Sequence, residues 1–206
     1  MRKAAMLFLS VMFLLALACD PACAAGQRLF GAVTRDGKDA AAGVRVSVWD
    51  GSRAHNAVSD LNGRFAIDGM PAGALFAVRF SWGRGCFVRM DGLRFPANGD
   101  LFVFADRGEV QNGAVYRVRV PSNPSTGYSW ALAGLFPKEA LSFCGKEEEP
   151  ACGSDTARPM VGLGGFEAWL FRAERPGRAT LLMTHSRPWE KGGSPDKYCI
   201  CAIKVR

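Results

Sequence analysis

The stretch Val44-Arg45-Val46-Ser47-Val48-Trp49, followed by Asp50-Gly51, contains the pattern that determines the fold of this chain. Valine fills every second position, and the positions between hold a charged, a polar and an aromatic residue. Side chains of a strand alternate between its two faces, so this period of two predicts a strand with one buried face. The Asp-Gly pair tolerates positive φ and predicts a tight turn after the strand.

The same succession of short strands and turns continues through the chain after Gly26. Turn sequences recur about every ten residues, which is typical of a β-sandwich. Further strands are predicted at residues 29–33, 57–59, 65–67, 75–80 and 115–120, with turns at 36–37, 60–63 and 69–73. Apolar residues follow a helical period over ten residues or more in no segment. The sequence therefore predicts an all-β fold, built from two β-sandwich domains.

The first 24 residues have the features of a signal peptide. Arg2 and Lys3 form a positive start, residues 4–18 are apolar apart from one serine, and small residues suited to cleavage follow. The apolar run is shorter than the roughly 20 residues that span a bilayer. We expect residues 1–24 to be removed and the protein to be exported, either to the periplasm or out of the cell, with no integral membrane segment left. The alternative is a lipoprotein anchored at Cys19, although Leu17 stands one position later than the usual lipoprotein leucine.

The alternating pattern is interrupted near residues 104–113, where polar residues predominate. Asp106-Arg107-Gly108-Glu109 and Asn112-Gly113 are predicted as turns, and a new alternating strand follows them. About 180 residues remain after signal cleavage, which is room for two small domains. We therefore predict one domain over residues 25–105 and a second over residues 106–206.

Charge and histidine content argue against several classes of function. The net charge of +7 is scattered, with no run of five basic residues, so neither nucleic acid nor a membrane surface is an expected partner. The chain has two histidines, His55 and His185, and it lacks paired catalytic carboxylates and a Gly-x-Ser-x-Gly motif. A dyad of His185 with Cys199 or Cys201 would place the thiol on a strand, away from a helix N-terminus that could lower its pKa. We therefore expect no enzyme activity.

Seven cysteines are present, and five remain after the two in the signal region are removed. Cys144 and Cys152 flank a polar loop and are the candidates for a disulfide in an exported protein. Cys199 and Cys201 stand two apart on a predicted strand, so they share a face and are poor partners for each other. Cys86 is expected to be a buried, inert thiol. The spacing Cys-x-x-Cys does not occur, so we expect no metal and no other cofactor.

The first half of the chain resembles a known module. Gly31-Ala32-Val33, Ala42-Gly43-Val44-Arg45-Val46, and Ser59-Asp60-Leu61-Asn62-Gly63-Arg64-Phe65 with Gly69-Met70-Pro71-Ala72-Gly73 are similar to the carboxypeptidase regulatory-like domain. The resemblance covers roughly residues 27–105. It implies a transthyretin-like sandwich of about seven strands.

The second half contains three loop sequences with aromatic residues in or beside them. In Asn123-Pro124-Ser125-Thr126-Gly127-Tyr128, proline and glycine restrict the backbone and leave two hydroxyls at a stiff tip. A rigid hairpin turn without further function is the alternative. Trp130, on the same strand face as Tyr128, is expected in the core.

The other two loop sequences are Gly162-Leu163-Gly164-Gly165, before a strand at 166–172, and Arg187-Pro188-Trp189, after an apolar strand. Three glycines in four positions are costly in backbone entropy, but they let a backbone run close to a partner. A merely flexible loop is the alternative. An exposed Trp beside Arg suits an interface anchor, because these residues dominate binding hot spots. A Trp folded back onto its own domain is the alternative here.

Together, in this order and at this spacing, the three sequences resemble the three wedge loops of the chagasin family, which inhibits papain-like cysteine peptidases. The resemblance covers about residues 107–206, and Ser125 stands where the family most often has Thr. It implies an immunoglobulin-like sandwich with the three loops at one end. Because all three loops lie in residues 107–206, we expect that fragment alone to inhibit.

The resemblance also implies roles for individual residues. Thr126 would lie near the catalytic centre of the peptidase, the glycine-rich loop would cross the catalytic cysteine with Leu163 at a specificity pocket, and Trp189 would pack on an aromatic residue of the primed side. The implied function is that of a monomeric, reversible, competitive inhibitor of papain-like cysteine peptidases. A non-inhibitory β-sandwich binding or adhesion module at the cell surface is the alternative. The predicted contact residues are Asn123, Pro124, Ser125, Thr126, Gly127, Tyr128, Gly162, Leu163, Gly164, Gly165, Phe166, Arg187, Pro188 and Trp189.

Overall fold

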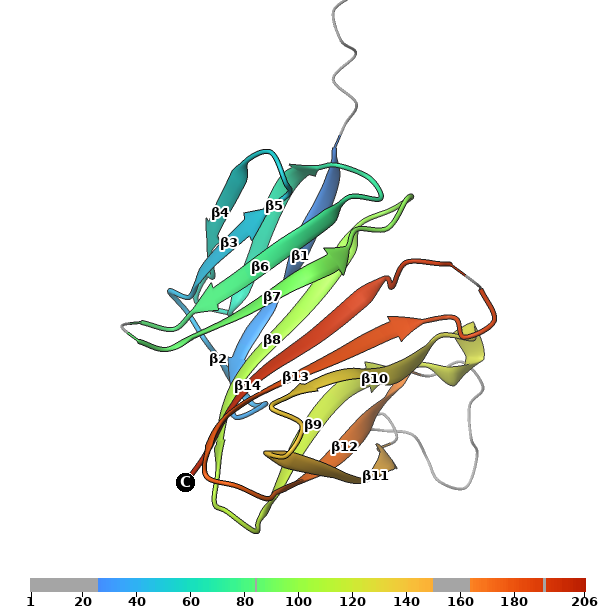
Figure 1. The fold of residues 1–206 in the computed structure, drawn as a ribbon. Helices are drawn as coiled ribbons and strands as arrows, with labels where there is room; N and C mark the ends of the chain where they lie inside the picture. Colours follow the sequence, from blue (N-terminus) through green and yellow to red (C-terminus); the bar gives the residue numbers. More distant parts are fainter. Residues whose placement is uncertain (1–25, 84, 150–163, 191) are drawn as a thin grey trace, which may run out of the picture.

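The computed structural model describes residues 26–83, 85–149, 164–190 and 192–206, and these residues form an all-β fold (Figure 1). The predicted fold class is confirmed. The strands are β1 (Gln27–Arg35), β2 (Asp39–Ala40), β3 (Arg45–Trp49), β4 (Ala54–Val58), β5 (Arg64–Met70), β6 (Leu75–Ser81), β7 (Phe87–Arg94), β8 (Leu101–Val110), β9 (Val115–Ser122), β10 (Ser129–Phe136), β11 (Leu141–Glu149), β12 (Gly165–Ala173), β13 (Gly177–Ser186) and β14 (Lys197–Val205). Within the described part of the chain, no helix has the length and hydrophobicity needed to cross a membrane. The predicted signal peptide, its cleavage site and Cys19 lie outside the described residues.

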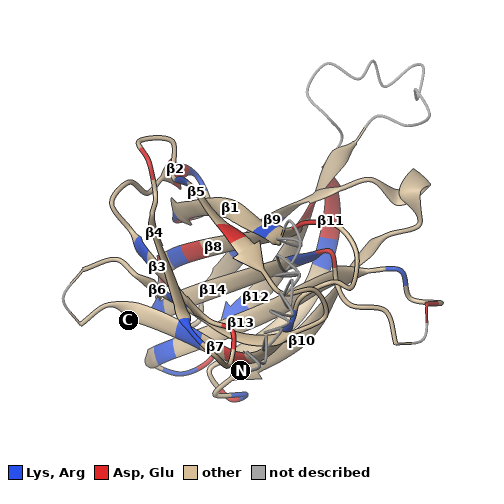
Figure 2. Cartoon of the chain, turned by 90° about the horizontal axis from the view of Figure 1, so that it is seen from above, with Lys and Arg blue, Asp and Glu red and all other residues tan. Residues whose placement is uncertain are grey.

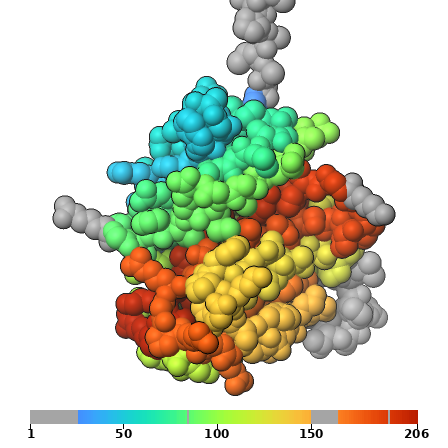
Figure 3. All heavy atoms as spheres, viewed as in Figure 1, coloured from blue at the N-terminus to red at the C-terminus, as the bar shows by residue number. Residues whose placement is uncertain are grey.

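The strands form three sheets, and the largest is shared by both halves of the chain. A seven-stranded sheet runs in the order β10-β13-β14-β8-β1-β2, with β5 also paired to β1. A four-stranded sheet, β4-β3-β6-β7, covers one face of it, and a three-stranded sheet, β11-β12-β9, covers the other. The two halves are therefore two sandwiches that meet in one continuous sheet, and Figure 3 shows them packed directly on each other.

Strand β14 shows how one sheet serves two cores. Tyr198 and Ile200 point into the core of the N-terminal half, whereas Cys199 and Cys201 point into the core of the C-terminal half. This follows from the alternation of side chains across a strand. The Tyr198 hydroxyl also donates to the backbone oxygen of Arg94 at 3.1 Å and accepts from its nitrogen at 3.0 Å, which joins β14 to β7.

One sequence prediction is wrong at the junction. Residues 106–109 were predicted as a polar turn, but they are the second half of β8, which pairs in parallel with β1 on one side and β14 on the other. Polar residues are tolerated in this strand because the folded protein supplies hydrogen-bonding partners for their side chains. The turn lies just beyond, at residues 111–114. The division into domains at 105/106 stays a prediction, and that boundary falls inside β8.

Asp106 explains how a charged residue can occupy the centre of this sheet. It is only 2% exposed, and its carboxylate accepts hydrogen bonds from Thr34 Oγ1 at 2.6 Å, from the backbone nitrogen of Gly37 at 3.0 Å, and from the Tyr116 hydroxyl. Burial raises the pKa of Tyr116 well above its usual range, so Tyr116 remains a neutral donor. Asp106 thereby links the first turn of the N-terminal half to β9 of the C-terminal half.

We expect Asp106→Ala to lower the free energy of unfolding by about 2–4 kcal/mol, because three donors would lose a charged acceptor in a buried site. Tyr116→Phe should cost less, since it removes one donor and leaves Asp106 its two other partners. Urea unfolding followed by circular dichroism measures both changes. Because Asp106 ties both halves together, equal stability of wild type and Asp106→Ala would contradict its assigned role.

Candidate functional site

The three predicted loops lie at the same end of the C-terminal sandwich. The first loop, residues 123–128, joins the end of β9 to the start of β10, and the described end of the second, Gly164-Gly165, runs into the start of β12. The third, residues 187–189, follows the end of β13. Strand register brings these points together, since Ser129 pairs with Ser186, Gly165 with Ser122, and His185 with Lys197. The predicted convergence of the loops is therefore observed for every loop residue that the structure describes.

The first loop is held rigid by its own hydrogen bonds. Residues 124–126 form a short 3-10 turn, and Gly127 adopts φ of 76°, the left-handed conformation that glycine allows. The side chain of Ser125 donates to Asn123 Oδ1 at 2.7 Å, and that of Thr126 donates to the Asn123 backbone oxygen at 2.8 Å. The tip therefore needs little further ordering on binding a partner. Trp130 is buried and donates to the Pro121 oxygen, as predicted for a core residue.

A stack of side chains joins the first loop to the third. Tyr128 lies parallel to the His185 ring, with centroids 5.2 Å apart and an interplanar angle of 11°. The Arg187 guanidinium covers the Tyr128 ring at 4.6 Å. His185 is 4% exposed and pairs with Asp196 Oδ1 at 2.7 Å. The hydrogen bond with Glu190 raises the pKa of Arg187, so Arg187 stays charged above the ring.

Trp189 is the most exposed aromatic residue of the three loops. It is 65% exposed, yet the edge of its ring lies directly over Gly127, where any side chain on Gly127 would collide with it. Pro188 is exposed beside it. The ring is thus presented to solvent in a defined position, and it belongs to no core cluster among the described residues. Trp189 thus touches its own domain at Gly127, but most of its ring stays open to solvent.

The second loop is described only at its end. Gly162 and Leu163 lie outside the described residues. Gly164 is exposed and lies beside the base of the first loop, because a β-carbon on it would be 3.6 Å from the Ser122 backbone oxygen. Gly165 already pairs with Ser122 as the first residue of β12.

Phe166 takes a different position from the rest of the predicted contact residues. It is half-buried, and the Arg119 guanidinium covers its ring at 3.4 Å. Arg119 in turn donates to Glu149 Oε2 at 2.7 Å. Phe166 therefore lies under Arg119 at the side of the loop end rather than at a loop tip.

Glu167 is a residue of this site that the sequence analysis missed. Although it is 6% exposed, its carboxylate accepts from Ser122 Oγ at 2.8 Å and from Trp169 Nε1 at 3.1 Å, and it lies 3.6 Å from Lys146 Nζ. It therefore fixes β9 to β12 directly beneath the first and second loops. The only signal in the sequence is an acidic residue among apolar ones in a strand, which is too common to indicate a site.

His185 and Asp196 were also missed as members of the site, although His185 stands two residues before Arg187. Together with the first loop and the described end of the second, His185 and Asp196 line a shallow hollow of about 400 Å³. In the described residues, no hydrogen bond joins His185 to a hydroxyl or a thiol, and the Ser125 and Thr126 hydroxyls donate to Asn123. Among the described residues, the arrangement offers shape and hydrogen-bonding groups, and none of its hydroxyls or thiols is hydrogen-bonded to a histidine.

The cysteines that the structure describes lie in strands or in the β6–β7 turn, outside the three loops. Cys199 and Cys201 share a face as predicted, with sulfurs 3.7 Å apart, and the hydrogen bond with Cys199 together with burial raises the pKa of Cys201. Cys144 is exposed on β11. Its predicted partner Cys152 lies outside the described residues, so that disulfide stays a prediction.

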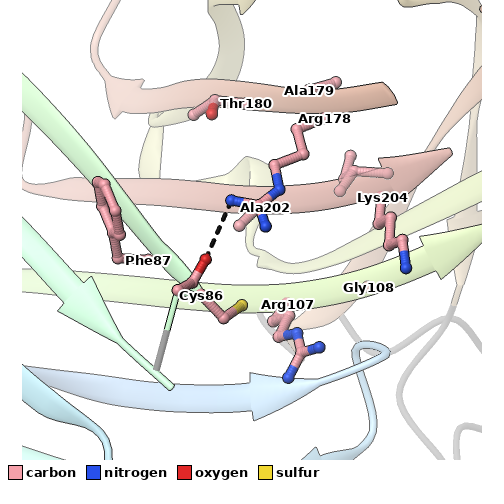
Figure 4. A pocket seen from close by; sticks show the side chains of 11 residues that line it. Cys86, Phe87, Arg107, Gly108, Arg178, Ala179, Thr180, Ala202 and Lys204 are labelled. Atoms are coloured by element: carbon pink, nitrogen blue, oxygen red, sulfur yellow. Dashed lines mark hydrogen bonds between the residues drawn. The ribbon is translucent and has the colours of Figure 1, made fainter. Parts of the chain in front are cut away.

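Cys86 differs from the buried, inert thiol that was predicted. It is half-buried in a hollow of about 250 Å³, beside Arg107, Arg178 and Lys204 (Figure 4). Arg178 donates to the Gly85 oxygen at 3.1 Å, which ties the β6–β7 turn to β13. This hollow lies toward the C-terminal ends of β8 and β14, so it is remote from the loop end. Figure 2 shows that Lys and Arg alternate with Asp and Glu along the strands and turns of the described chain.

Comparison with known proteins identifies the half of the chain that carries these loops. Residues 109–203 match the family model described as "Chagasin family peptidase inhibitor I42". The matched segment, which is called the chagasin domain below, contains the sequences of all three loops. Amoebiasin-2 of Entamoeba histolytica is 26% identical over 90 residues, which are 44% of this chain and 69% of that protein.

Two solved structures are similar to part of the chain. The cysteine protease inhibitor EhICP2 from Entamoeba histolytica is 24% identical, with a TM-score of 0.41, over 50% of this chain and 86% of that chain. PbICP-C, solved in complex with falcipain-2, is 14% identical, with a TM-score of 0.40, over 52% of this chain and 91% of that chain. The resemblance of residues 27–105 to the carboxypeptidase regulatory-like domain stays a prediction.

Proposed function

We propose that this protein is an exported, monomeric inhibitor of papain-like cysteine peptidases that binds reversibly and competitively. In this proposal the three loops of the chagasin domain enter the active-site cleft and block it. The observation that carries the proposal is the rigid group formed by the first and third loops, in which Trp189 lies over Gly127 and Arg187 over Tyr128. The match of residues 109–203 to a family of peptidase inhibitors supports the choice of target.

The rigidity of these loops matters for affinity. Association costs free energy for every side chain and loop that must be ordered, so loops held in place beforehand bind more tightly. The first loop is fixed by hydrogen bonds to Asn123, and its aromatic residue is held by the stack with His185. Exposed Trp and Arg are the residue types that most often dominate binding energy. Inhibition in this proposal comes from shape and needs no covalent bond.

The proposal is tested by titrating papain with the full-length protein and measuring hydrolysis of a fluorogenic peptide. We expect complete inhibition that is overcome by raising the substrate concentration and reversed by dilution. Hydrolysis of the same peptide by the protein alone would point to an enzyme instead. Failure of the folded protein to inhibit papain and cathepsin L would reject the proposal.

We expect Trp189→Ala to weaken inhibition by about 1–4 kcal/mol, the range of an interface hot spot. Its effect on the free energy of unfolding should stay within about 1 kcal/mol, because the side chain is 65% exposed. Inhibition constants and thermal unfolding measure the two effects. Trp49→Ala is the matched control, since Trp49 is also exposed, on β3 of the N-terminal half. A large loss of stability without a specific loss of inhibition would mean that Trp189 serves the fold.

A further inference from the structure

The N-terminal half places a loop of its own beside the three loops of the chagasin domain. Residues 95–100, here called the fourth loop, connect β7 to β8. Strand β8 runs parallel to β14, with Phe102 opposite Lys197, and the Phe102 nitrogen donates to the Asp196 oxygen at 3.2 Å. Parallel neighbours begin at the same edge of a sheet. The fourth loop therefore leads into β8 at the same edge of the shared sheet where the β13–β14 hairpin, which carries the third loop, leads into β14. The fourth loop and this hairpin lie on the same side of Figure 1.

The strand order gives the separation of these loops. Along the seven-stranded sheet, β10 receives the first loop, β13 and β14 carry the hairpin of the third, and β8 receives the fourth. Neighbouring strands lie about 4.8 Å apart, so the first and fourth loops enter the sheet about 14 Å from each other. A protein interface of standard size covers about 800 Å² on each partner, which is roughly 30 Å across. A peptidase bound by the three loops would thus reach the fourth.

The fourth loop is also held in place at its base. The Phe95 nitrogen donates to the Ala74 oxygen at 2.8 Å, and the Pro96 oxygen accepts from the Gly73 nitrogen at 3.1 Å. On the other side, Gln27 Nε2 donates to the Ala97 oxygen at 3.2 Å, and the Arg28 nitrogen donates to Asp100 Oδ1 at 2.8 Å. Residues 97–100 remain exposed above this base. The loop is therefore ordered before any partner binds, like the first loop.

The length and chemistry of the fourth loop indicate which part of a partner it fits. Six residues join β7 to β8, whereas ten residues join β13 to β14, so the fourth loop extends less far than the hairpin of the third. Its exposed tip, Ala97-Asn98-Gly99-Asp100, carries two polar side chains, Asn98 and Asp100, and no large apolar one. Interfaces have an apolar centre and a polar rim. A shorter polar loop beside the wedge suits the rim of a cleft rather than its floor.

We propose that the fourth loop is an additional contact with the target peptidase, made at the rim of its cleft and centred on Asn98. This inference rests on the proposed function and gives the N-terminal half a direct part in recognition. Among related peptidases, the residues at the rim of the cleft vary more than the residues of the catalytic floor, because the floor must perform the same reaction in each of them. The fourth loop thereby contributes to the choice among papain-like peptidases.

The test compares inhibition constants of the full-length wild type, Asn98→Arg and Asn98→Glu against papain and cathepsin L. The matched controls are Asn62→Arg and Asn62→Glu. Asn62 is also exposed and is also followed by a glycine with positive φ, Gly63 at 71° and Gly99 at 83°. It lies toward the opposite end of the sheet, because Arg64 pairs with Ala32, five residues along β1 from Gln27. Thermal unfolding establishes that each variant is folded.

We expect at least one of the two Asn98 variants to change an inhibition constant tenfold or more, while both Asn62 variants stay within twofold of wild type. Changes below tenfold for both Asn98 variants on both enzymes would overturn the fourth contact and leave the three-loop inhibitor intact. A wild type that inhibits neither enzyme would overturn the proposed function, and the fourth contact with it. The two failures therefore give different results.

Discussion

A fragment of residues 107–206 is expected not to fold stably, even though it contains all three loops. The fragment lacks residues 101–106 of β8, so β14 loses its partners from Lys197 to Cys201. Tyr198 and Ile200, which are 4% and 0% exposed, would face water. The Tyr116 hydroxyl would also lose its acceptor, Asp106. This changes the expectation from sequence that the fragment inhibits alone.

The magnitudes favour this outcome. Exposing a large apolar side chain costs about 1.5–3 kcal/mol, and each lost ladder hydrogen bond costs about 1 kcal/mol. When the exposed side chains, the lost ladder hydrogen bonds and the unpaired Tyr116 hydroxyl are added, the free energy of unfolding falls by about 8 kcal/mol. Whole domains have a free energy of unfolding of only about 5–15 kcal/mol. Circular dichroism and thermal unfolding of residues 107–206, compared with residues 26–206, measure the difference. A cooperative unfolding transition in the short fragment would contradict the shared-sheet explanation.

Gly164→Val is expected to weaken inhibition by at least ~2 kcal/mol, comparable to the loss of a hot spot. In the proposed complex the backbone of the second loop lies along the catalytic cysteine. A β-branched side chain there restricts φ and occupies the space between the two backbones. The fold should remain intact, because a β-carbon on Gly164 would be 3.6 Å from the Ser122 oxygen, an ordinary contact.

Gly164→Ala is the matched control, since it adds the β-carbon without the branch and should cost less. Leu163→Ala, at a position outside the described residues, should change the ranking among peptidases more than the average affinity, because a pocket contact sets preference. Inhibition constants on two papain-like enzymes measure these effects, and circular dichroism confirms the fold. Equal inhibition by wild type and Gly164→Val on both enzymes would remove the second loop from the mechanism.

The sequence by itself determined the all-β class and the residues of the loops. Both are local properties, since alternating valines in 44–49 specify a buried face and the Asn-Pro and Gly-rich stretches restrict or free the backbone where they stand. The buried positions of Val46 and Val48, and the core position of Trp130, follow the predicted pattern. Glu167 and Asp106 could not be found in this way, because a lone acidic residue in a strand gives no sign of partners far along the chain.

Only the tertiary structure decided how these parts are combined. Strand β8 was predicted in part as a turn because its polar residues look exposed, and it became a central strand because Thr34, Gly37 and Tyr116 satisfy Asp106. Its pairing with β14 joins residues about 95 positions apart, such as Phe102 with Lys197. A side-chain period specifies which face of a strand is buried but not which strand lies beside it. The shared sheet, the stack of Tyr128 on His185 and the place of the fourth loop therefore depend on long-range pairing that no local pattern records.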